Sequence, residues 1–315
     1  MLITLETREL QLRQPIVTAH GRITHRRIIE ITAKEGRFQG YGEASPLPGF
    51  GLESFDESLA ALQSWLQNPS HLPNPPSARS GAVTAIENLA KARVSGPLSN
   101  GKIAVQALIG STEISSIESE IAAALAQGYL GIKMKVAATD IKTDIARIRR
   151  AAEVVGSDSI LRLDANGGWS LKDALHVLSA VDSSDVDLIE EPTANYLDWA
   201  KVREETGINI GADEQLTNEA QVHQLLQHGA AQTFVIKPSV IGGPSITREI
   251  AELAKMHGVN TLISSFLDGP IGLRSARDLA MELAPEEIHG LGTAPLFVEK
   301  LPEDVVPIEG FLHRS

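Results

Sequence analysis

Six charged residues stand inside or at the ends of short apolar runs in the second half of the chain. Lys133 and Lys135 lie in the run at residues 131–136, and Lys237 ends the run at 233–237. Three acids end the runs between them, namely Asp164, Glu190 and Asp213. A charged group at the end of an apolar strand is costly unless it is paired or functional. Carboxylate oxygens suit a hard cation such as Mg²⁺, and nearby lysines can transfer protons.

These runs belong to a regular alternation of strand-like and helix-like segments. We predict eight strands, at residues 103–109, 131–136, 160–164, 187–190, 209–213, 233–237, 261–264 and 288–291. Helical spacing separates them, for example at residues 116–127, 141–155, 171–181, 218–227, 246–257 and 275–283. Eight strands with intervening helices favour an α/β fold with a closed parallel barrel, a TIM barrel, over an open sheet.

The order of the strands predicts where the six charged residues meet. Catalytic side chains of such barrels lie at the carboxyl ends of the strands, where these residues stand. The three acids end the third, fourth and fifth strands, so we expect them to converge in one sector of the barrel mouth. Lys133 and Lys135 are two positions apart and point to the same side of the second strand. Lys237 ends the sixth strand, so we expect the lysines to face one another across a metal ion. A structural ion-pair network is the alternative.

The first 98 residues have a different pattern and predict a separate α+β capping domain. They contain strand-like and helix-like segments, at residues 2–12, 26–33, 54–66 and 81–94. The stretch SGPLSNGK at residues 95–102 marks the expected boundary with a barrel domain at 99–293. Residues 294–315 are expected to return to the capping domain and complete it.

Composition limits the classes of function. The chain has 315 residues, of which 43% are apolar, and 28 basic residues against 40 acidic ones give a net charge of −12. This balance argues against a nucleic-acid partner, because no basic stripe is present to neutralise phosphates. The chain has no cysteine, so a metal would need oxygen or imidazole ligands. No signal pattern or membrane-length apolar run is visible, so we expect a cytoplasmic protein with no membrane partner. The oligomeric state stays open.

Five motifs together resemble the enolase superfamily, in its muconate-lactonizing-enzyme-like subgroup: Lys133-Met134-Lys135, Asp164-Ala165-Asn166, Glu190-Glu191-Pro192, Asp213-Glu214 and Lys237-Pro238. The resemblance implies a modified (β/α)₇β barrel with an α+β capping domain over essentially the whole chain. It implies that Asp164, Glu190 and Asp213 bind Mg²⁺ and that the three lysines are acid and base groups. Asn166, Glu191 and Glu214 would support the metal ligands.

Within this subgroup the chain is most similar to the o-succinylbenzoate synthase family. The stretch GEASPLPGF at residues 42–50 resembles the substrate loop of that family, and the strand ends at Ser264-Ser265 and 290–293 also fit. The substrate contacts implied by this resemblance are Arg162, Ser264, Ser265, Gly290, Gly292, Pro48 and Phe50. Arg162 could instead pair with an acid, and the two serines could serve ordinary turns. The roles of His20 and Arg22 stay open.

The implied reaction is the Mg²⁺-dependent syn-dehydration of 2-succinyl-6-hydroxy-2,4-cyclohexadiene-1-carboxylate to o-succinylbenzoate in menaquinone biosynthesis. Lys135 would act as the base and then as the acid, because one group can take a proton and return it to a leaving hydroxyl. Lys133 would contact the substrate carboxylate and, as a neighbouring cation, favour the neutral form of Lys135. Lys237 would hold the opposite face by charge and cation–π attraction.

Two other kinds of protein stay open. An N-succinylamino-acid racemase or a dipeptide epimerase would use Lys135 and Lys237 as opposed bases on the same scaffold. Residues 290–293 carry no acidic pair to hold an α-ammonium group, which argues against the dipeptide epimerase. A non-catalytic barrel scaffold predicts at least one broken position among the six charged residues, and none is broken.

Overall fold

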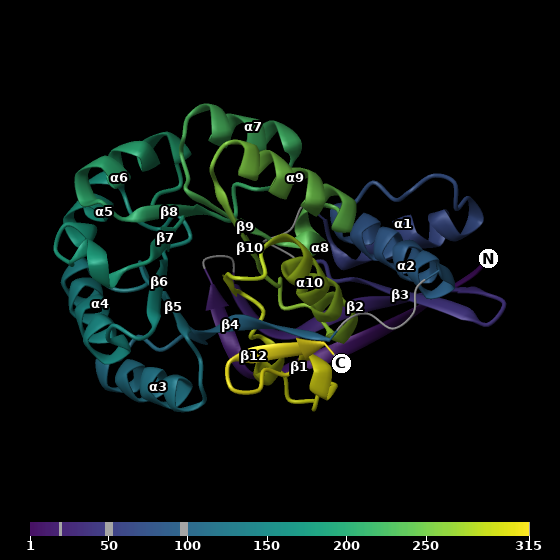
Figure 1. The fold of residues 1–315 in the computed structure, drawn as a ribbon, viewed down its shortest axis with the longest axis horizontal. Helices are drawn as coiled ribbons and strands as arrows, with labels where there is room; N and C mark the ends of the chain where they lie inside the picture. Colours follow the sequence, from purple (N-terminus) through teal and green to yellow (C-terminus); the bar gives the residue numbers. More distant parts are fainter. Residues whose placement is uncertain (19–20, 48–52, 95–99, 315) are drawn as a thin grey trace.

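A three-stranded antiparallel sheet and two helices make up the N-terminal part of the chain (Figure 1). The structure is a computed structural model that describes residues 1–18, 21–47, 53–94 and 100–314. The elements of this part are β1 (Leu2–Thr18), β2 (Gly21–Glu35), β3 (Phe38–Ala44), α1 (Phe55–Gln67) and α2 (Pro76–Val94). Trp65 of α1 and Leu89 of α2 pack with Ile29 and Ile31 of β2 in a single apolar cluster. The helices therefore cover one face of the sheet.

Eight parallel strands form a ring in the rest of the chain. They are β4 (Gly101–Ile109), β5 (Gly131–Lys135), β6 (Ile160–Asp164), β7 (Leu188–Glu190), β8 (Asn209–Ala212), β9 (Thr233–Ile236), β10 (Asn260–Ile263) and β11 (Ile288–His289). Neighbouring strands pair in chain order from β4 to β10, and β11 pairs with β4. The ring closes where Gly290 N donates to Ile263 O at 3.0 Å and Ser265 N donates to Gly290 O at 3.0 Å.

Helices follow the first seven strands of the ring and lie outside it (Figure 1). They are α3 (Ile114–Ala126), α4 (Ile141–Val155), α5 (Leu171–Leu178), α6 (Trp199–Thr206), α7 (Glu219–Gln227), α8 (Pro238–Ile241), α9 (Pro244–Met256) and α10 (Pro270–Leu283). Short 3₁₀ turns are η1 (Ser183–Asp185), η2 (Tyr196–Asp198), η3 (Ala294–Leu296) and η4 (Glu303–Val305). The main apolar core lies between strands and helices and includes Met134, Leu163 and Ile148. The predicted (β/α)₇β barrel with an α+β cap is confirmed.

The C-terminal segment contacts both parts of the fold. Val298 N donates to Gln11 O at 2.8 Å, and Phe297 packs with Leu10 and Leu12 of β1. The last strand, β12 (Phe311–Arg314), pairs antiparallel with β4. The division into domains at residues 1–98, 99–293 and 294–315 stays a prediction. Among the described residues, no helix has both the length and the apolar character needed to cross a membrane.

Candidate active site

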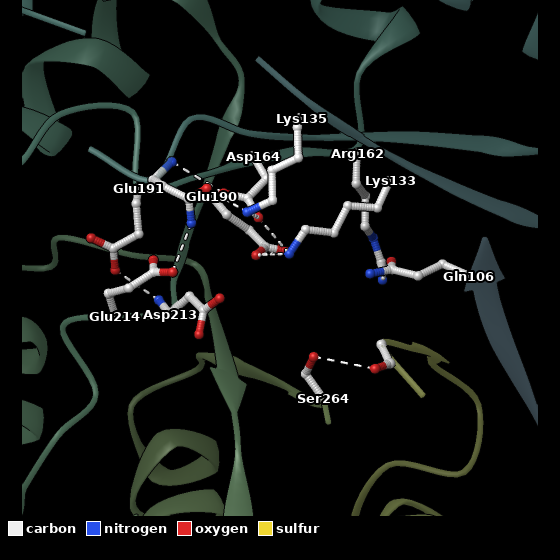
Figure 2. A network of polar contacts seen from close by, with 12 residues as sticks. Gln106, Lys133, Lys135, Arg162, Asp164, Glu190, Glu191, Asp213, Glu214 and Ser264 are labelled. Carbon is white, nitrogen blue, oxygen red and sulfur yellow. Dashed lines mark hydrogen bonds and ion pairs between the residues drawn. The ribbon is translucent and has the colours of Figure 1, made fainter. Parts of the chain in front are cut away.

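Two lysines of β5 meet on one carboxylate oxygen at the carboxyl end of the barrel (Figure 2). Alternation along the strand directs Met134 to the apolar core and leaves Lys133 and Lys135 on the inner face. Lys133 Nζ lies 2.7 Å from Asp164 Oδ2 and 2.5 Å from Glu190 Oε2. Lys135 Nζ lies 2.9 Å from the same Asp164 oxygen. The side chain of Lys135 is 38% exposed, against 10% for Lys133, so Lys135 is the more accessible amine.

The three acids converge as an acidic triad of Asp164, Glu190 and Asp213. One carboxylate oxygen from each lies within 4.8 Å of the other two. All three residues are buried, at 1%, 0% and 5% exposure respectively. Carboxylates this close repel one another unless cations lie between them. Glu190 Oε1 is buried and accepts no hydrogen bond from any residue that the structure describes. An all-oxygen set with an unpaired buried oxygen fits a hard divalent cation.

Lys237 lies on the other side of the acidic triad. It directly follows β9, whereas Lys133 and Lys135 belong to β5, and strands β6, β7 and β8 lie between these two. Its Nζ is 2.6 Å from Asp213 Oδ1 and 5.4 Å from the centre of the Phe266 ring. Ammonium groups therefore flank the triad at both ends.

The close charges shift the pKa values of the site in opposite directions. Burial disfavours the charged form of Asp164, but the ammonium groups of Lys133 and Lys135 hold its pKa below the ordinary range. Burial raises the pKa of Glu190 to about 7, Lys133 opposes this rise, and Asp164 and Asp213 add to it. Burial alone would lower the pKa of Lys133, yet the carboxylates of Asp164 and Glu190 raise it well above its ordinary value. Lys133 is therefore a fixed cation between two ligand candidates.

Three polar residues support the triad and the lysines. Asn166 Oδ1 accepts a hydrogen bond from Lys135 Nζ, and Asn166 Nδ2 donates to Glu214 Oε1 at 2.7 Å. Glu191 Oε1 accepts from the backbone N–H of Asp213 at 2.8 Å (Figure 2). Asn166 and Glu191 adopt left-handed backbone conformations, with φ of 44° and 45°. Such strain persists only where surrounding contacts hold it, and it is frequent at functional sites.

Arg162 makes its contacts elsewhere in the barrel interior. Its guanidinium donates to Asp187 Oδ2 at 2.7 Å, to Gln106 Oε1 at 3.1 Å and to Ile288 O at 2.5 Å. Asp187 immediately precedes β7 and Ile288 begins β11, so these contacts lie toward the amino ends of the strands. Within the described part of the chain, no hydrogen bond joins Arg162 to the acidic triad. These contacts agree with the alternative in which Arg162 pairs with an acid, here Asp187, and does not contact the substrate.

The remaining predicted substrate contacts lie at the barrel seam. Ser264 Oγ donates to Gly290 O at 3.2 Å (Figure 2), and the hydroxyls of Ser265 and Thr293 are 2.8 Å apart. A side chain at Gly290 would collide with Ser264, and one at Gly292 would lie 2.5 Å from Gln106 O. Pro48, Phe50 and His20 fall outside the described residues, and Arg22 is exposed on β2.

Two charged residues near the site escaped the sequence analysis. Asp144 and Arg147 are buried on α4, at 0% and 1% exposure, and Arg147 contacts the backbone of Lys135. The signal was their spacing: both fall on the helix face that also carries Ile148 and Ala151, where an apolar residue is expected.

Comparisons with known proteins agree with this geometry. Residues 116–314 match the family model described as enolase C-terminal domain-like. The chain is 29% identical over 310 residues to the o-succinylbenzoate synthase of Escherichia coli, covering 93% of this chain and 92% of the relative. It is 30% identical over 303 residues to that of Citrobacter koseri, with the same coverage. Because these relatives are enzymes and the motif is intact, the prediction of an enzyme is confirmed.

Solved structures share the fold at lower identity. A dipeptide epimerase from Enterococcus faecalis, solved with Mg and the dipeptide L-Leu-L-Tyr, has a TM-score of 0.89 at 21% identity, over 99% of this chain and 96% of that one. An N-succinyl Arg/Lys racemase from Bacillus cereus has a TM-score of 0.86 at 21% identity, over 99% and 92%. Family model, relatives and fold agree, and the chain belongs to the enolase C-terminal domain-like family of the enolase superfamily.

Proposed function

We propose that this chain catalyses the Mg²⁺-dependent syn-dehydration of 2-succinyl-6-hydroxy-2,4-cyclohexadiene-1-carboxylate to o-succinylbenzoate, a step of menaquinone biosynthesis. The observation that carries the proposal is the buried acidic triad flanked by ammonium groups. It occurs in a chain that resembles o-succinylbenzoate synthases over 93% of its length. A site of this kind suits removal of the weakly acidic proton beside a carboxylate.

Asp164, Glu190 and Asp213 would hold the Mg²⁺ ion. Support comes from the all-oxygen composition of the triad, its close spacing and the unpaired Glu190 oxygen. When bound, the cation supplies positive charge where the substrate carboxylate becomes more negative, and electrostatic stabilisation of this kind usually contributes most to the rate enhancement. Glu191, through its bond to the Asp213 N–H, keeps the third ligand at the end of its strand.

Lys135 would perform both proton transfers. Its neutral amine takes the ring proton from the carbon that bears the carboxylate, and the C–H electron pair becomes delocalised over that carboxylate and the ring. The new ammonium group then gives its proton to the hydroxyl on the adjacent carbon, which departs as water while the electron pair forms the ring double bond. One group acting on one face accounts for a syn elimination. Its 38% exposure, against 10% for Lys133, supports Lys135 as the group that reaches the substrate.

The other two lysines would act as fixed cations. Lys133 is held between Asp164 and Glu190, where its charge would attract the substrate carboxylate. Lys237 lies beyond Asp213 and near the Phe266 ring, on the far side of the triad. From there it would stabilise the opposite face of the delocalised ring by charge and cation–π attraction.

Racemisation of an N-succinylamino acid or epimerisation of a dipeptide is the second candidate. The observation that favours it is the placement of Lys135 and Lys237 on strands at opposite ends of the triad, as two bases on opposite faces of a Cα would require. In that reaction one lysine removes the α-proton and the other returns a proton to the opposite face. A bifunctional enzyme would perform both reactions.

The experiment is to incubate the protein with Mg²⁺ and the cyclohexadiene carboxylate while the absorbance of the aromatic product is followed. Lys135→Ala should abolish product formation, whereas Lys142→Ala, which removes an exposed lysine on α4, should leave it unchanged. Full activity in Lys135→Ala would contradict the assigned base. In parallel, N-succinylamino acids and dipeptides are incubated in D₂O and their Cα deuterium content is measured. Deuterium uptake without aromatic product would favour the second candidate.

A further inference from the structure

Asp144 and Arg147 form a buried ion pair behind the end of β5. Arg147 Nη1 lies 2.8 Å from Asp144 Oδ1, and Asp144 and Arg147 are 0% and 1% exposed. Removing two charges from water is costly, so such a pair is tolerated only where further hydrogen bonds satisfy its remaining atoms. Those further bonds go to loops and strand ends at the carboxyl end of the barrel, and they leave Arg147 Nε without a partner among the described residues.

Arg147 fixes the backbone that carries the proposed base. Its Nη2 donates to Lys135 O at 2.9 Å and to Ser111 O at 3.0 Å. Lys135 is the last residue of β5, and Ser111 follows the end of β4. The guanidinium therefore ties the ends of two neighbouring strands together at the point where Lys135 enters the site.

Asp144 fixes the turn after Lys135 and the loop after β6. Its Oδ2 accepts from Ala137 N at 2.8 Å and from Trp169 Nε1 at 3.3 Å, and its Oδ1 accepts from Thr139 Oγ1 at 2.7 Å. Ala137 has a left-handed backbone with φ of 62°, a conformation that a non-glycine residue adopts only when it is held there. The loop of Trp169 also carries Asn166, which binds Lys135 Nζ.

We propose that the Asp144–Arg147 pair is a positioning element for Lys135. Arg147 holds the backbone of Lys135 directly. Asp144 holds the loop after β6, which carries Asn166, the hydrogen-bond partner of the Lys135 amine. Both residues are buried and would not touch the substrate. Their removal should therefore slow proton transfer while leaving substrate binding nearly unchanged. The inference rests on the proposed function in so far as Lys135 is the base.

Arg147→Met removes the donors while keeping most of the volume. We expect kcat to fall about 10- to 100-fold, because a displacement of about 1 Å at a reacting group costs on that order. KM should stay within about 3-fold, and the deuterium isotope effect with substrate labelled at the abstracted position should increase, because proton transfer becomes slower relative to the other steps. Arg147→Lys keeps a cation beside Asp144 but cannot span both carbonyls, so it should restore part of kcat.

Arg277→Met is the matched control. Arg277 is also buried, at 5% exposure, and donates to two backbone carbonyls, Asp304 O at 2.9 Å and His313 O at 3.0 Å, away from the triad. It should lower the melting temperature yet leave kcat and the isotope effect within about 2-fold of wild type. Circular dichroism establishes that each variant is folded before it is assayed.

The accessibility of Lys135 is measured independently of any reaction. Reductive methylation followed by peptide mass spectrometry gives the labelling rate of each lysine. We expect Arg147→Met, or Arg147→Lys if the former does not fold, to change the rate at Lys135 by more than about 3-fold while Lys142 is unaffected. If wild type forms no aromatic product, the proposed function fails alone and this labelling decides the inference. Three results would each overturn the positioning role. They are unchanged Lys135 labelling in Arg147→Met, a kcat of Arg147→Met within about 2-fold of wild type, and an equal loss of kcat in Arg277→Met.

Discussion

Glu43 is a buried carboxylate that joins β3 to the start of α10. It is 4% exposed and accepts hydrogen bonds from Gly269 N at 2.6 Å, Ile271 N at 3.1 Å, Gly272 N at 3.2 Å and Ser45 Oγ at 2.5 Å. Burial raises its pKa to about 7 and the nearby Asp268 adds to this, whereas the hydrogen bonds oppose it. Arg26 is the cation of the same cluster. Glu43 should therefore make the free energy of unfolding depend on pH near neutrality.

The sign of this dependence follows from the proton balance. The pKa of Glu43 has an ordinary value of 4.5, against about 7 in the folded protein. Between these two values the folded state holds a proton that the unfolded state has lost, so stability falls as pH rises through the window. A difference of about 2.5 pKa units corresponds to about 3 kcal/mol, at about 1.36 kcal/mol per unit. The loss in the free energy of unfolding reaches its full value above about pH 7 and is absent below about pH 4.5.

Glu43→Gln removes this titration. Urea unfolding of both proteins is measured from about pH 4.5 to 7.5, in the presence of a chelator, and the variant's free energy is subtracted from that of wild type. All other acids are shared, so the difference should fall by about 3 kcal/mol as pH rises. Glu57→Gln is the control, because hydrogen bonds from Ser54 lower the pKa of Glu57, so its titration lies below this pH range and the corresponding difference should stay nearly flat. A wild-type minus Glu43→Gln difference that is flat to within about 0.5 kcal/mol would refute the reasoning. It would mean that the four hydrogen bonds keep the carboxylate charged.

Three further outcomes are expected. Mg²⁺ should raise the melting temperature in differential scanning fluorimetry, and Asp213→Asn should remove most of the rise, because one of three ligand carboxylates is lost; no response in wild type would contradict the metal site. Arg162→Met should lower the free energy of unfolding by about 2–4 kcal/mol in urea titrations, because the buried Gln106 and the half-buried Asp187 lose their donor. Its kcat should stay within about 2-fold of wild type; a selective loss of kcat would favour a substrate contact instead. Gly290→Ala should cost about 1–3 kcal/mol by the same measurement, because the new methyl group meets Ser264; Gly110→Ala, where space is open, should cost much less, and equal costs would argue against the tight seam.

Most of the barrel could be predicted from the sequence. The strand predicted at 160–164 coincides with β6, and the one predicted at 103–109 lies within β4, because strands buried on both faces appear as continuous apolar runs. The strand predicted at 288–291 is shorter, and β11 ends at His289 because Gly290 makes only a single bridge, to Ser264. Such an end depends on a partner strand, which a local pattern does not contain.

The capping sheet was harder to predict from local patterns. Residues 38–44 form the strand β3 although they include glycines at 40 and 42, a residue type that is infrequent in strands. A side chain at Gly40 would collide with the backbone of Leu89, and one at Gly42 with the backbone of Gly81. Glycine is required because α2 crosses closely over the strand. That approach joins distant segments and leaves no periodic signal.

The candidate site also contains residues that could be predicted from the sequence and residues that could not. The acidic triad and the lysines could be predicted because each stands at the end of an apolar strand and the strands follow one another in order. The Asp144–Arg147 pair left only its spacing on the apolar helix face as a signal, and its partners, like those of Glu43, could not be predicted, because they lie in other segments of the chain. Glu43 bonds Gly269, which lies 226 positions away in the chain.

The strand that closes the barrel, β11, and the last strand, β12, follow every other described strand in the chain, and both pair with β4, the first strand of the ring. The partner of Gln11 in β1, Glu299, is 288 positions away. During translation, β4 therefore leaves the ribosome long before its closing partners are made. Its open edge is a template for pairing with other chains in that interval. Newly made protein should for this reason depend on chaperones more than an equally stable fold built from local contacts.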